Sequence, residues 1–519
     1  MKINNHWCRW IIGILCIGLY TACSDEWNNH YDRGSSLPTM SLWEQICNDD
    51  NLSTFAMAIK LVEADTLLAS NQTYTVWAPV NDALQEIDLE DVESLRRMVK
   101  NHIARYASPT STPAFQRISM LNGKSMEFAS GKYAGVTLIA SNIRATNGIL
   151  HKLADQIPYK YNILEYTSVH PDYSCIYEFI SKFNEKIYDA SLSTTYDSIF
   201  IDYNRLLQDA KYGIGSIGDE DSLYTMIIPN NAAWESTFNR ISPYFHSYNK
   251  DENMADSVQV VQTSLAILGG LTFPGKVSMF DACDALQTIT GNTISNVAYY
   301  FKGYEAIEAS NGIIYLAQGE LNANDTCVWN HNIILEAEDM DHRQNLSGTN
   351  SYTRTTDINS LVNGVSEGSY LEVSSGNVDG GVIFDITNTL AGIYDVYVDF
   401  VSPIVDGKNL IDEKTKVTFQ FKYIGANGKT MTANNNTGTV VGAVESEGII
   451  TVKAFEGMKL PVSNYYDGMW YLEEANIGAE IAKTTTLQVK TKVTNTDAKK
   501  GYVRKFRVDR VRLVPVITE

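Results

Sequence analysis

One sequence pattern occurs twice in this chain, about 150 residues apart, and a repeat of that length predicts two copies of one domain. YTVWAPVNDAL begins at Tyr74, and YTMIIPNNAAW begins at Tyr224. Each copy contains a short apolar run, typical of a buried strand, that ends at a proline. The side-chain oxygens of Asn81 and Asp82, or Asn230 and Asn231, are expected to cap the helix that follows.

A second pair of matching stretches supports the repeat. SNIRATNGILHKLADQIPY starts at Ser141, and IEASNGIIYLAQGEL starts at Ile307. In both, Asn-Gly favours a tight primed turn followed by an apolar strand. Around these signatures the sequence predicts helices over residues 92–106, 176–183 and 254–268. Two stretches of the second copy, residues 188–218 and 235–250, are interpreted as surface insertions.

Both copies resemble fasciclin-like domains, whose signatures are a TVFAPTNDAF-type strand–turn–helix and an NGVIHVID-type hairpin strand. The resemblance implies α+β domains at residues 37–160 and 168–322. The first copy keeps the histidine of the second signature, His151, whereas Tyr315 replaces it in the more degenerate second copy. By resemblance, His151 is expected to pack against the core and to hydrogen-bond the strand–turn segment.

The first 22 residues are interpreted as a signal peptide. Lys2 and Arg9 precede an apolar run that is too short to span a bilayer. The run ends in LYTAC, which resembles the bacterial lipobox, so Cys23 is predicted to be acylated and to become the N-terminus. The alternative is an ordinary secretory signal with an incidental cysteine. Acylation would anchor the chain to a membrane through residues 23–36, a polar tether.

The residues after Cys23 and the overall charge bear on location and partners. Ser24, Asp25 and Glu26 look like the surface-export signal of glycan-harvesting Gram-negative bacteria, which predicts the outer face of the outer membrane. A formal net charge of −20 disfavours nucleic acid as a partner. Four scattered cysteines, which lack metal-binding spacing, leave a disulfide open without selecting a pair: Cys47, Cys175, Cys283 and Cys327.

Beyond about residue 330 the apolar residues alternate with polar ones, which predicts an all-β sandwich over residues 330–519. A change of parity between Val508 and Val511 predicts a bulge around Asp509 and Arg510. LEAEDM, AGIYDVYVDF and FRVDRVRLV resemble the signatures of jelly-roll carbohydrate-binding modules of families six and thirty-five. The predicted fold is therefore two α+β fasciclin-like domains followed by a jelly-roll sandwich.

Three carboxylates of the sandwich form a candidate metal site. Glu336 and Glu338 share a strand parity, so their side chains are expected on one face. With Asp509, they match positions that hold a structural calcium in the resembling modules, and carboxylate oxygens suit Ca²⁺. A salt-bridged surface and a glycosidase-like acid pair are the alternatives.

A candidate glycan-binding segment lies within residues 461–474. Aromatic rings stack on the C–H faces of sugars, and Asn or Asp bonds the hydroxyls. The alternative is that some of the rings face the sandwich core. The candidates are Asn464, Tyr465, Tyr466, Asp467, Trp470 and Tyr471, and weaker ones outside this segment are Tyr352 and Tyr370.

The sequence contains no recognisable catalytic motif, so a non-catalytic protein is predicted. The favoured hypothesis is a surface lipoprotein that binds polysaccharide or oligosaccharide, accessory to an outer-membrane glycan importer and its lipoprotein lid. The rival is an adhesion or assembly protein whose fasciclin-like domains bind a protein partner and whose sandwich is structural. An enzyme is the third interpretation.

Overall fold

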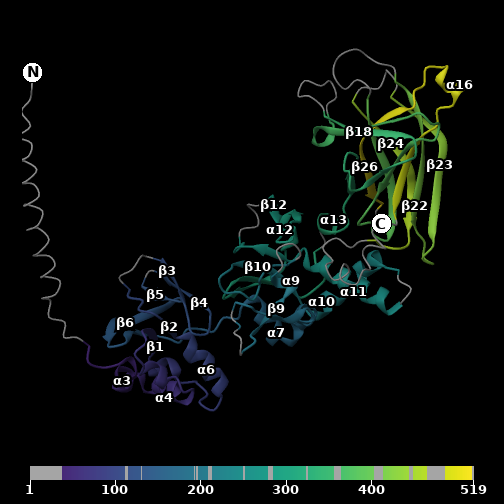
Figure 1. Cartoon of the computed structure of the whole chain (residues 1–519). Helices are drawn as coiled ribbons and strands as arrows, with labels where there is room; N and C mark the ends of the chain where they lie inside the picture. Colours follow the sequence, from purple (N-terminus) through teal and green to yellow (C-terminus); the bar gives the residue numbers. More distant parts are fainter. Residues whose placement is uncertain are drawn as a thin grey trace, which may run out of the picture. The chain divides into compact units, whose positions relative to one another are not determined.

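The structure is a computed structural model that describes most of the chain and divides it into two compact units, Met1–Lys160 and Tyr161–Glu519. Each unit is considered separately (Figure 1). The predicted signal peptide, Cys23 and the tether lie outside the described residues. Described are residues 38–110, 115–129, 131–191, 193, 197–208, 213–248, 252–278, 284–322, 325–355, 364–402, 413–442, 448–464 and 485–516.

The first unit is an α+β domain built on a seven-stranded sheet in the order β2-β1-β7-β6-β5-β4-β3. Its helices are α3 (Leu42–Cys47), η1 (Asp50–Leu52), α4 (Ser53–Leu61), α5 (Asp65–Leu68), η2 (Asn81–Leu84) and α6 (Val92–Asn101). Its strands are β1 (Tyr74–Pro79), β2 (Ile103–Arg105), β3 (Phe115–Ser119), β4 (Ser125–Ala129), β5 (Lys132–Tyr133), β6 (Val136–Ala145) and β7 (Gly148–Leu153).

The signature strand β1 lies at the centre of the domain, and all six of its residues are buried. It pairs in parallel with β7 and antiparallel with β2. The helix predicted over residues 92–106 ends at Asn101, so its predicted end was wrong. Ile103 instead begins β2 and pairs with Val76, because a buried apolar residue at that position completes the sheet.

The turn between β6 and β7 consists of Thr146 and Asn147, one residue earlier than the Asn-Gly pattern suggests. The Asn147 side chain accepts a hydrogen bond from the Leu42 amide (2.8 Å) and donates to the carbonyls of Leu68 and Ser70 (2.7 Å each). Gly148 then begins β7 at a φ of +153°, and a Cβ there would lie 1.9 Å from the Tyr74 carbonyl oxygen. Only glycine allows this close approach of two strands.

The second unit begins with a smaller version of the same domain, whose sheet has the order β11-β10-β15-β14. Its helices are α7 (Ile163–Val169), η3 (Pro171–Tyr173), α8 (Ser174–Ser181), α9 (Arg205–Gln208), α10 (Asn231–Ile241), η4 (Ser242–Phe245), α11 (Glu252–Leu268), α12 (Val297–Tyr300) and α13 (Asp325–Val328). Its strands are β8 (Asn184–Tyr188), β9 (Phe200–Asn204), β10 (Tyr224–Pro229), β11 (Thr272–Pro274), β12 (Ala285–Gln287), β13 (Thr293–Ser295), β14 (Glu305–Ala309) and β15 (Gly312–Ala317).

One of the two asparagines after the signature strand has the same role in both repeats. Asn230 caps α10 through the Ala233 amide (2.8 Å), as predicted. Asn231 instead holds the start of α8, because its side chain accepts from the Cys175 amide and donates to the Pro171 carbonyl. Asn81 binds the start of α4 in the same way, so the prediction that it caps the following helix was wrong.

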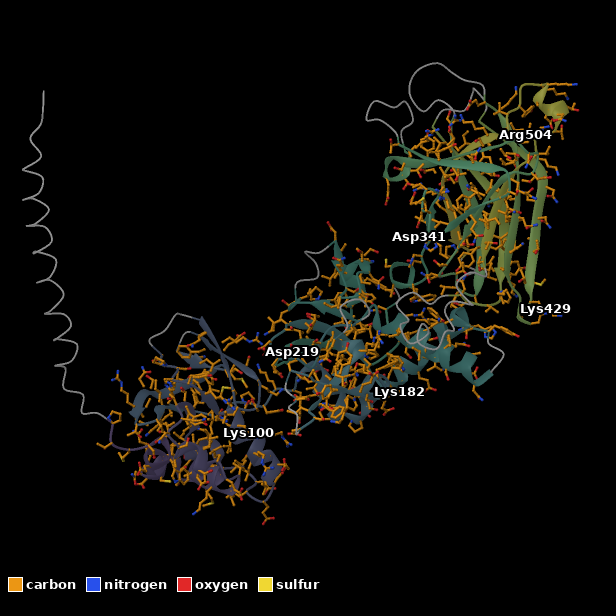
Figure 2. All side chains as sticks on the ribbon, in the orientation of Figure 1. Lys100, Lys182, Asp219, Asp341, Lys429 and Arg504 are labelled. Carbon is orange, nitrogen blue, oxygen red and sulfur yellow. The ribbon has the colours of Figure 1, made fainter. Side chains whose placement is uncertain are left out.

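Part of the predicted insertion at residues 188–218 forms a hairpin with the end of the preceding segment. Strands β8 and β9 pair only with each other among the described strands. Asn204 anchors the base of the hairpin by donating to the Ile180 carbonyl (2.8 Å). Lys182, which precedes the hairpin, and Asp219, which follows it, are exposed charged residues of the repeat (Figure 2).

The rest of the second unit is a sandwich of two antiparallel sheets, ordered β18-β19-β26-β21-β24, with β16 also paired to β26, and β17-β20-β25-β22-β23. The strands of the first sheet are β16 (Ile333–Glu336), β18 (Thr349–Thr355), β19 (Ser369–Ser375), β21 (Gly392–Val401), β24 (Ile449–Leu460) and β26 (Lys505–Pro515). The strands of the second are β17 (Arg343–Asn345), β20 (Gly381–Asp385), β22 (Thr415–Ile424), β23 (Thr430–Val441) and β25 (Thr486–Thr491), and the short helices are η6 (Ser366–Gly368) and α16 (Asn495–Ala498).

Alternate residues of the long strands fill the space between the two sheets, as the period-two pattern predicts. Val396, Val398 and Phe400 of β21 are buried, as is Phe419 of β22 on the facing sheet. The predicted bulge is present, because Asp399 pairs with Arg510 while Phe400 pairs with Val508, which leaves Asp509 without a partner across the ladder. The fold class predicted from the sequence is thus confirmed.

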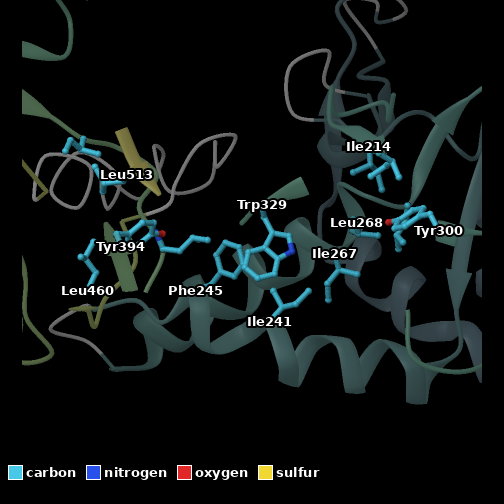
Figure 3. Packing of buried hydrophobic residues seen from close by; sticks show 14 of the residues in the cluster. Ile214, Ile241, Phe245, Ile267, Leu268, Tyr300, Trp329, Tyr394, Leu460 and Leu513 are labelled. Carbon is cyan, nitrogen blue, oxygen red and sulfur yellow. The ribbon is translucent and has the colours of Figure 1, made fainter. Parts of the chain in front are cut away.

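The second repeat and the sandwich share a hydrophobic core. Trp329, in the segment that connects them, is buried and packs 5.0 Å from Tyr244 and 5.7 Å from Phe245 between ring centroids. Tyr394 and Leu460 of the sandwich belong to the same cluster (Figure 3). Among the helices that the structure describes, none is both long and apolar enough to cross a membrane.

Candidate functional site

Of the three predicted metal ligands, Glu336 lies near both Glu338 and Asp509, beside the bulge in β26. Glu336 ends β16, Glu338 follows it by two residues, and Asp509 is the bulged residue. Ser366 links two of them: its hydroxyl donates to Glu336 Oε1 (2.8 Å), and its backbone amide donates to Asp509 Oδ1 (2.9 Å). Strand pairing and one turn therefore bring together residues far apart in the chain.

The other carboxylate oxygens of this cluster lack hydrogen bonds. Glu336 Oε2, Glu338 Oε2 and Asp509 Oδ2 are buried without a hydrogen-bond partner among the described residues, although Arg510 Nε lies 3.8 Å from Asp509 Oδ2. Burial, together with the nearby Glu336 carboxylate, raises the pKa of Asp509 to about 6. Burial and the charges of Glu336 and Glu367 also raise the pKa of Glu338.

These properties fit a hard cation, because leaving a buried carboxylate oxygen unpaired is costly and Ca²⁺ prefers oxygen ligands. Within the described part of the chain, however, no three Asp, Glu, His or Cys side chains are already arranged to hold a metal ion. Besides carboxylates, Ca²⁺ also accepts hydroxyl and carbonyl oxygens as ligands. Calcium at Glu336, Glu338 and Asp509 stays a prediction.

A second feature is the outer face of the sheet that contains β26, opposite the sandwich core. Along this face Glu372 of β19 binds three cations: Arg354 (2.9 Å), Lys505 (3.1 Å) and Arg507 (3.2 Å). Glu413 adds a second carboxylate to Arg507 (2.6 Å). Burial opposes ionisation of Glu372, but hydrogen bonds from Arg354 and Lys505 outweigh burial and lower its pKa.

Further along the outer face, Asp399 is almost fully buried beneath two arginines. It accepts hydrogen bonds from Arg510 (2.9 Å), Arg512 (2.7 and 2.9 Å) and the Thr451 hydroxyl (2.7 Å). Burial opposes ionisation of this carboxyl, but the arginine hydrogen bonds lower its pKa. Although Asp399 has the parity of an outward residue, the long side chains above it exclude water.

Two tyrosine rings lie on the outer face beside these ionic clusters. Tyr352 is 52% exposed, and the Arg354 guanidinium lies 5.1 Å from its ring centroid. Tyr397 is half-buried, with Arg512 at 5.3 Å and Lys453 at 5.5 Å from its centroid. Aromatic rings beside fixed polar groups are what a sugar-binding surface requires.

The predicted glycan-binding segment is described only at its start. Asn464 is buried, with its side chain bonded to the backbone of Thr389 (2.6 Å) and Ile386 (3.1 Å) and to the Thr485 hydroxyl. This side chain ties strand ends together and has no hydrogen-bonding capacity left for a ligand. Tyr465, Tyr466, Asp467, Trp470 and Tyr471 lie outside the described residues, so their role stays a prediction.

His151 has the surroundings expected of a structural residue. Its ring stacks on Trp77 (5.5 Å between centroids, 12° apart), and Nε2 lies 3.1 Å from the Ser108 carbonyl oxygen. Burial lowers its pKa, so the neutral ring predominates near pH 7. Of the cysteines, Cys47, Cys175 and Cys327 are free thiols in the part of the chain that the structure describes.

The comparisons with known proteins begin with the first domain. Residues 50–157 match the family of the Fasciclin domain. This confirms the resemblance predicted from its two signatures. The transforming growth factor-beta-induced protein ig-h3 of Sus scrofa is 28% identical over 163 residues, which are 28% of this chain and 24% of that protein. The chain thus spans about a quarter of the length of this relative.

Two solved structures resemble larger parts of the chain at low identity. A FAS1 domain pair from the insect cell adhesion molecule Fasciclin I is 16% identical, with a TM-score of 0.20, and the match covers 54% of this chain and 99% of that structure. The CBM22-1 xylan-binding domain of Paenibacillus barcinonensis Xyn10C is 10% identical, with a TM-score of 0.21, and the match covers 36% and 94%.

Proposed function

We propose that this chain is a non-catalytic surface protein whose β-sandwich binds polysaccharide. The outer face carries the proposal, because it places Tyr352 and Tyr397 beside guanidinium and carboxylate groups whose positions are fixed by ion pairs. Such a surface can stack on the C–H faces of sugar rings and hydrogen-bond their hydroxyls. The predicted segment of residues 465–471 would add further aromatic rings.

Affinity electrophoresis of the purified chain over a panel of polysaccharides tests this proposal. Replacing Tyr352 or Tyr397 by alanine is expected to weaken retention by about five- to tenfold, the value of one stacked ring. The matched control is Tyr299→Ala, which removes an exposed tyrosine from the second repeat. Equal retention of all the variants, or no retention by any glycan, would contradict the proposal.

We further propose that the chain is anchored by an acylated Cys23 in the outer membrane and faces the exterior. The lipobox-like sequence and the acidic residues that follow it support this location. In that position the chain would serve an outer-membrane glycan importer and its lipoprotein lid. Loss of metabolic palmitate labelling in Cys23→Ala tests the anchor, and digestion by protease added to intact cells tests the orientation.

Absence of catalysis is part of the proposal and has its own test. No reducing ends should be released from a polysaccharide that the purified chain retains. If they are released, Glu336→Gln and Glu338→Gln would show whether these carboxylates act as an acid pair. We also propose that Glu336, Glu338 and Asp509 hold a structural Ca²⁺, since each of the three carboxylates has one buried oxygen without a hydrogen bond.

Adhesion to a protein partner is the second candidate, and the β8–β9 hairpin favours it. On one face of the hairpin, the paired side chains Tyr188 and Phe200 are each 54% exposed. On the other face, the paired side chains Ile187 and Ile201 are each 37% exposed. Exposed apolar groups on an isolated hairpin are typical of a protein contact. Co-purification of importer components that is lost in Tyr188→Ser/Phe200→Ser, with glycan retention unchanged, would support this candidate.

A further inference from the structure

An open pocket of about 620 Å³ lies where the second repeat meets the sandwich. The repeat contributes Pro243, His246 and Gln259 to its lining, and the sandwich contributes the start of β21 and the end of β24. Two backbone hydrogen bonds fix these walls. The Ala391 amide donates to the Tyr244 carbonyl (2.8 Å), and the Ser463 amide donates to the His246 carbonyl (2.7 Å).

This pocket continues the outer face of the sandwich. Ile393 of β21 and Lys459 of β24 both line it and are paired across the two strands. Ile393 precedes Tyr397 by four residues in the same strand, so the two side chains share the outward parity. A polysaccharide bound along Tyr397 therefore reaches the pocket at the end of the sheet, where the second repeat forms a wall.

The charge of the pocket is opposite to that of the chain. Although the net charge of the protein is −20, no Asp or Glu occurs among the described residues that line the pocket. Lys459 supplies an ammonium group and His246 an imidazole, while Pro243, Ile393 and Leu460 supply apolar surface. An ammonium with no carboxylate beside it in the pocket attracts an anionic group, and the apolar wall suits the C–H face of a sugar ring.

We propose that this pocket binds an acidic sugar unit, carboxylated or sulfated, of the polysaccharide that lies on the outer face. The inference rests on the proposed polysaccharide binding and specifies its substrate class. Lys459 would pair with the acidic group of the sugar. The second repeat would then be part of the binding site, because one wall of the pocket comes from η4 and α11.

Calorimetric titration of the purified chain with matched oligosaccharides tests the inference. In the methyl ester of oligogalacturonate each carboxylate is replaced by a neutral ester, and a sulfated galactan oligosaccharide with its desulfated form separates sulfate from carboxylate. At least one acidic probe is expected to bind about tenfold more tightly than its neutral form. Lys459→Gln should abolish that difference, whereas Lys422→Gln, which changes an exposed lysine of the facing sheet, should preserve it.

The outcomes distinguish this inference from the proposed function. Equal affinity for the acidic and neutral forms, in a chain that retains any polysaccharide, overturns the acidic pocket and leaves polysaccharide binding in place. An acidic preference that survives in Lys459→Gln also overturns it. Absence of binding to every probe and every polysaccharide overturns both. A filling variant, Ala391→Trp, should reduce binding of the acidic probe while the neutral form still binds.

Discussion

Thr75 of the first repeat and Thr225 of the second make the same hydrogen bonds. The Thr75 hydroxyl donates to the Tyr106 carbonyl (2.7 Å) and accepts from the Ser108 amide (2.9 Å). The Thr225 hydroxyl donates to the Gly275 carbonyl and accepts from the Val277 amide, both at 2.8 Å. Because Tyr106 and Gly275 each follow the short edge strand, both threonines fix the same loop.

The two repeats close this loop with different side chains. In the first, His151 Nε2 lies 3.1 Å from the Ser108 carbonyl oxygen, and in the second the Tyr315 hydroxyl donates to the Val277 carbonyl (3.0 Å). The replacement that makes the second copy look degenerate therefore preserves a bond to the equivalent carbonyl. Backbone-directed hydrogen bonds are what the repeats share, and the identity of the donor is free to change.

The repeats also differ at the residue that immediately precedes the edge strand, which is His102 in the first repeat and Leu271 in the second. The backbone amides of Trp77 and Ile227 bond to the carbonyls of His102 and Leu271, respectively. The Ile157 amide donates to His102 Nε2 (3.0 Å), so His102 Nδ1 carries the proton and donates to the Met98 carbonyl (2.8 Å). Leu271 is a buried apolar side chain and has no ionisable group. The first repeat should thus respond to acid where the second does not.

The largest expected effect tests the glycine that both repeats need. In Gly148→Ala or Gly312→Ala, the new Cβ would lie 1.9 or 1.8 Å from a carbonyl oxygen of the neighbouring strand. Each change should lower the free energy of unfolding of its own unit by about 4 kcal/mol or more. Hydrogen exchange, followed separately in residues 38–160 and 161–322, measures this.

Matched controls are Gly123→Ala and Gly291→Ala. Both glycines have positive φ, but the added methyl would meet no atom within 4 Å. These variants should cost about 1 kcal/mol, the price of the backbone conformation alone. Equal losses at Gly148 and Gly123 would show that close strand approach does not constrain the repeat.

The next effect is acid sensitivity of the first repeat. Burial lowers the pKa of His102 to about 4, whereas an unfolded histidine titrates near 6.5. As pH falls, His102 takes up a proton in the unfolded chain before it does so in the folded chain. The stability contributed by the neutral ring is therefore complete above pH 6.5 and is lost between pH 6.5 and about pH 4. The loss should approach about 3 kcal/mol. Chemical denaturation across this range should show that slope in wild type and not in His102→Gln.

Calcium should stabilise the second unit and leave the first unchanged. At a concentration about 100-fold above its dissociation constant, Ca²⁺ should add about 2.7 kcal/mol to the free energy of unfolding. Calorimetric melting with Ca²⁺ or a chelator measures the gain. Asp509→Asn should remove it, whereas Asp341→Asn, a change at an exposed carboxylate of the same sandwich, should not.

When calcium is absent, Asp509 should make the second unit more stable as the pH falls, whereas His102 makes the first unit less stable. Because the folded pKa of Asp509 is raised to about 6 from an ordinary value of 3.8, the folded state binds a proton first. The stability contributed by this group therefore increases as pH falls from 6 towards 4, opposite to the trend at His102. A chelated second unit that shows no such gain relative to Asp509→Asn would contradict the assignment.

The smallest effect concerns the bond that replaces His151. Tyr315→Phe leaves the Val277 carbonyl without its hydroxyl donor and should cost about 1 kcal/mol. Urea denaturation of the chain measures this difference, with Tyr299→Phe at an exposed position as the control. Equal stability of the two variants would show that the tyrosine fills space and does not close the loop.

The sequence predicts the repeats and the sandwich well because their periodic apolar residues correspond to buried strand faces. It does not predict the role of Asn147 or Asn311, since a turn signal indicates where the chain reverses and not which distant backbone the side chain binds. Asn311 accepts from the Ile163 amide and donates to the carbonyls of Ile217 and Asp219. Those partners are far away in the sequence.

The candidate site was predicted in part. Shared parity and family resemblance selected Glu336, Glu338 and Asp509. Glu336 lies near each of the other two, but Glu338 lies beyond the end of β16, so strand parity does not place its side chain, and calcium binding stays a prediction. Of the outer face only Tyr352 was selected, as a weaker candidate, because alternate charged residues such as Asp395 and Asp399 also occur on any solvated strand, and the other weaker candidate, Tyr370, is buried. The signal that could have indicated it is the coincidence of arginines on β26 with acids on β19 and β21. Asn464 was assigned to ligand contact because a sequence cannot reveal its burial.

Trp329 changes how the connection between the second repeat and the sandwich should be regarded. The segment around it looks like a linker, yet its indole is only 4% exposed and packs against Tyr244 and Phe245. A connecting segment whose side chain is packed in the core cannot extend without disrupting that core. A force applied to the sandwich would therefore be transmitted through Trp329 to η4 and α10. The second repeat and the sandwich would then unfold together before they could move independently.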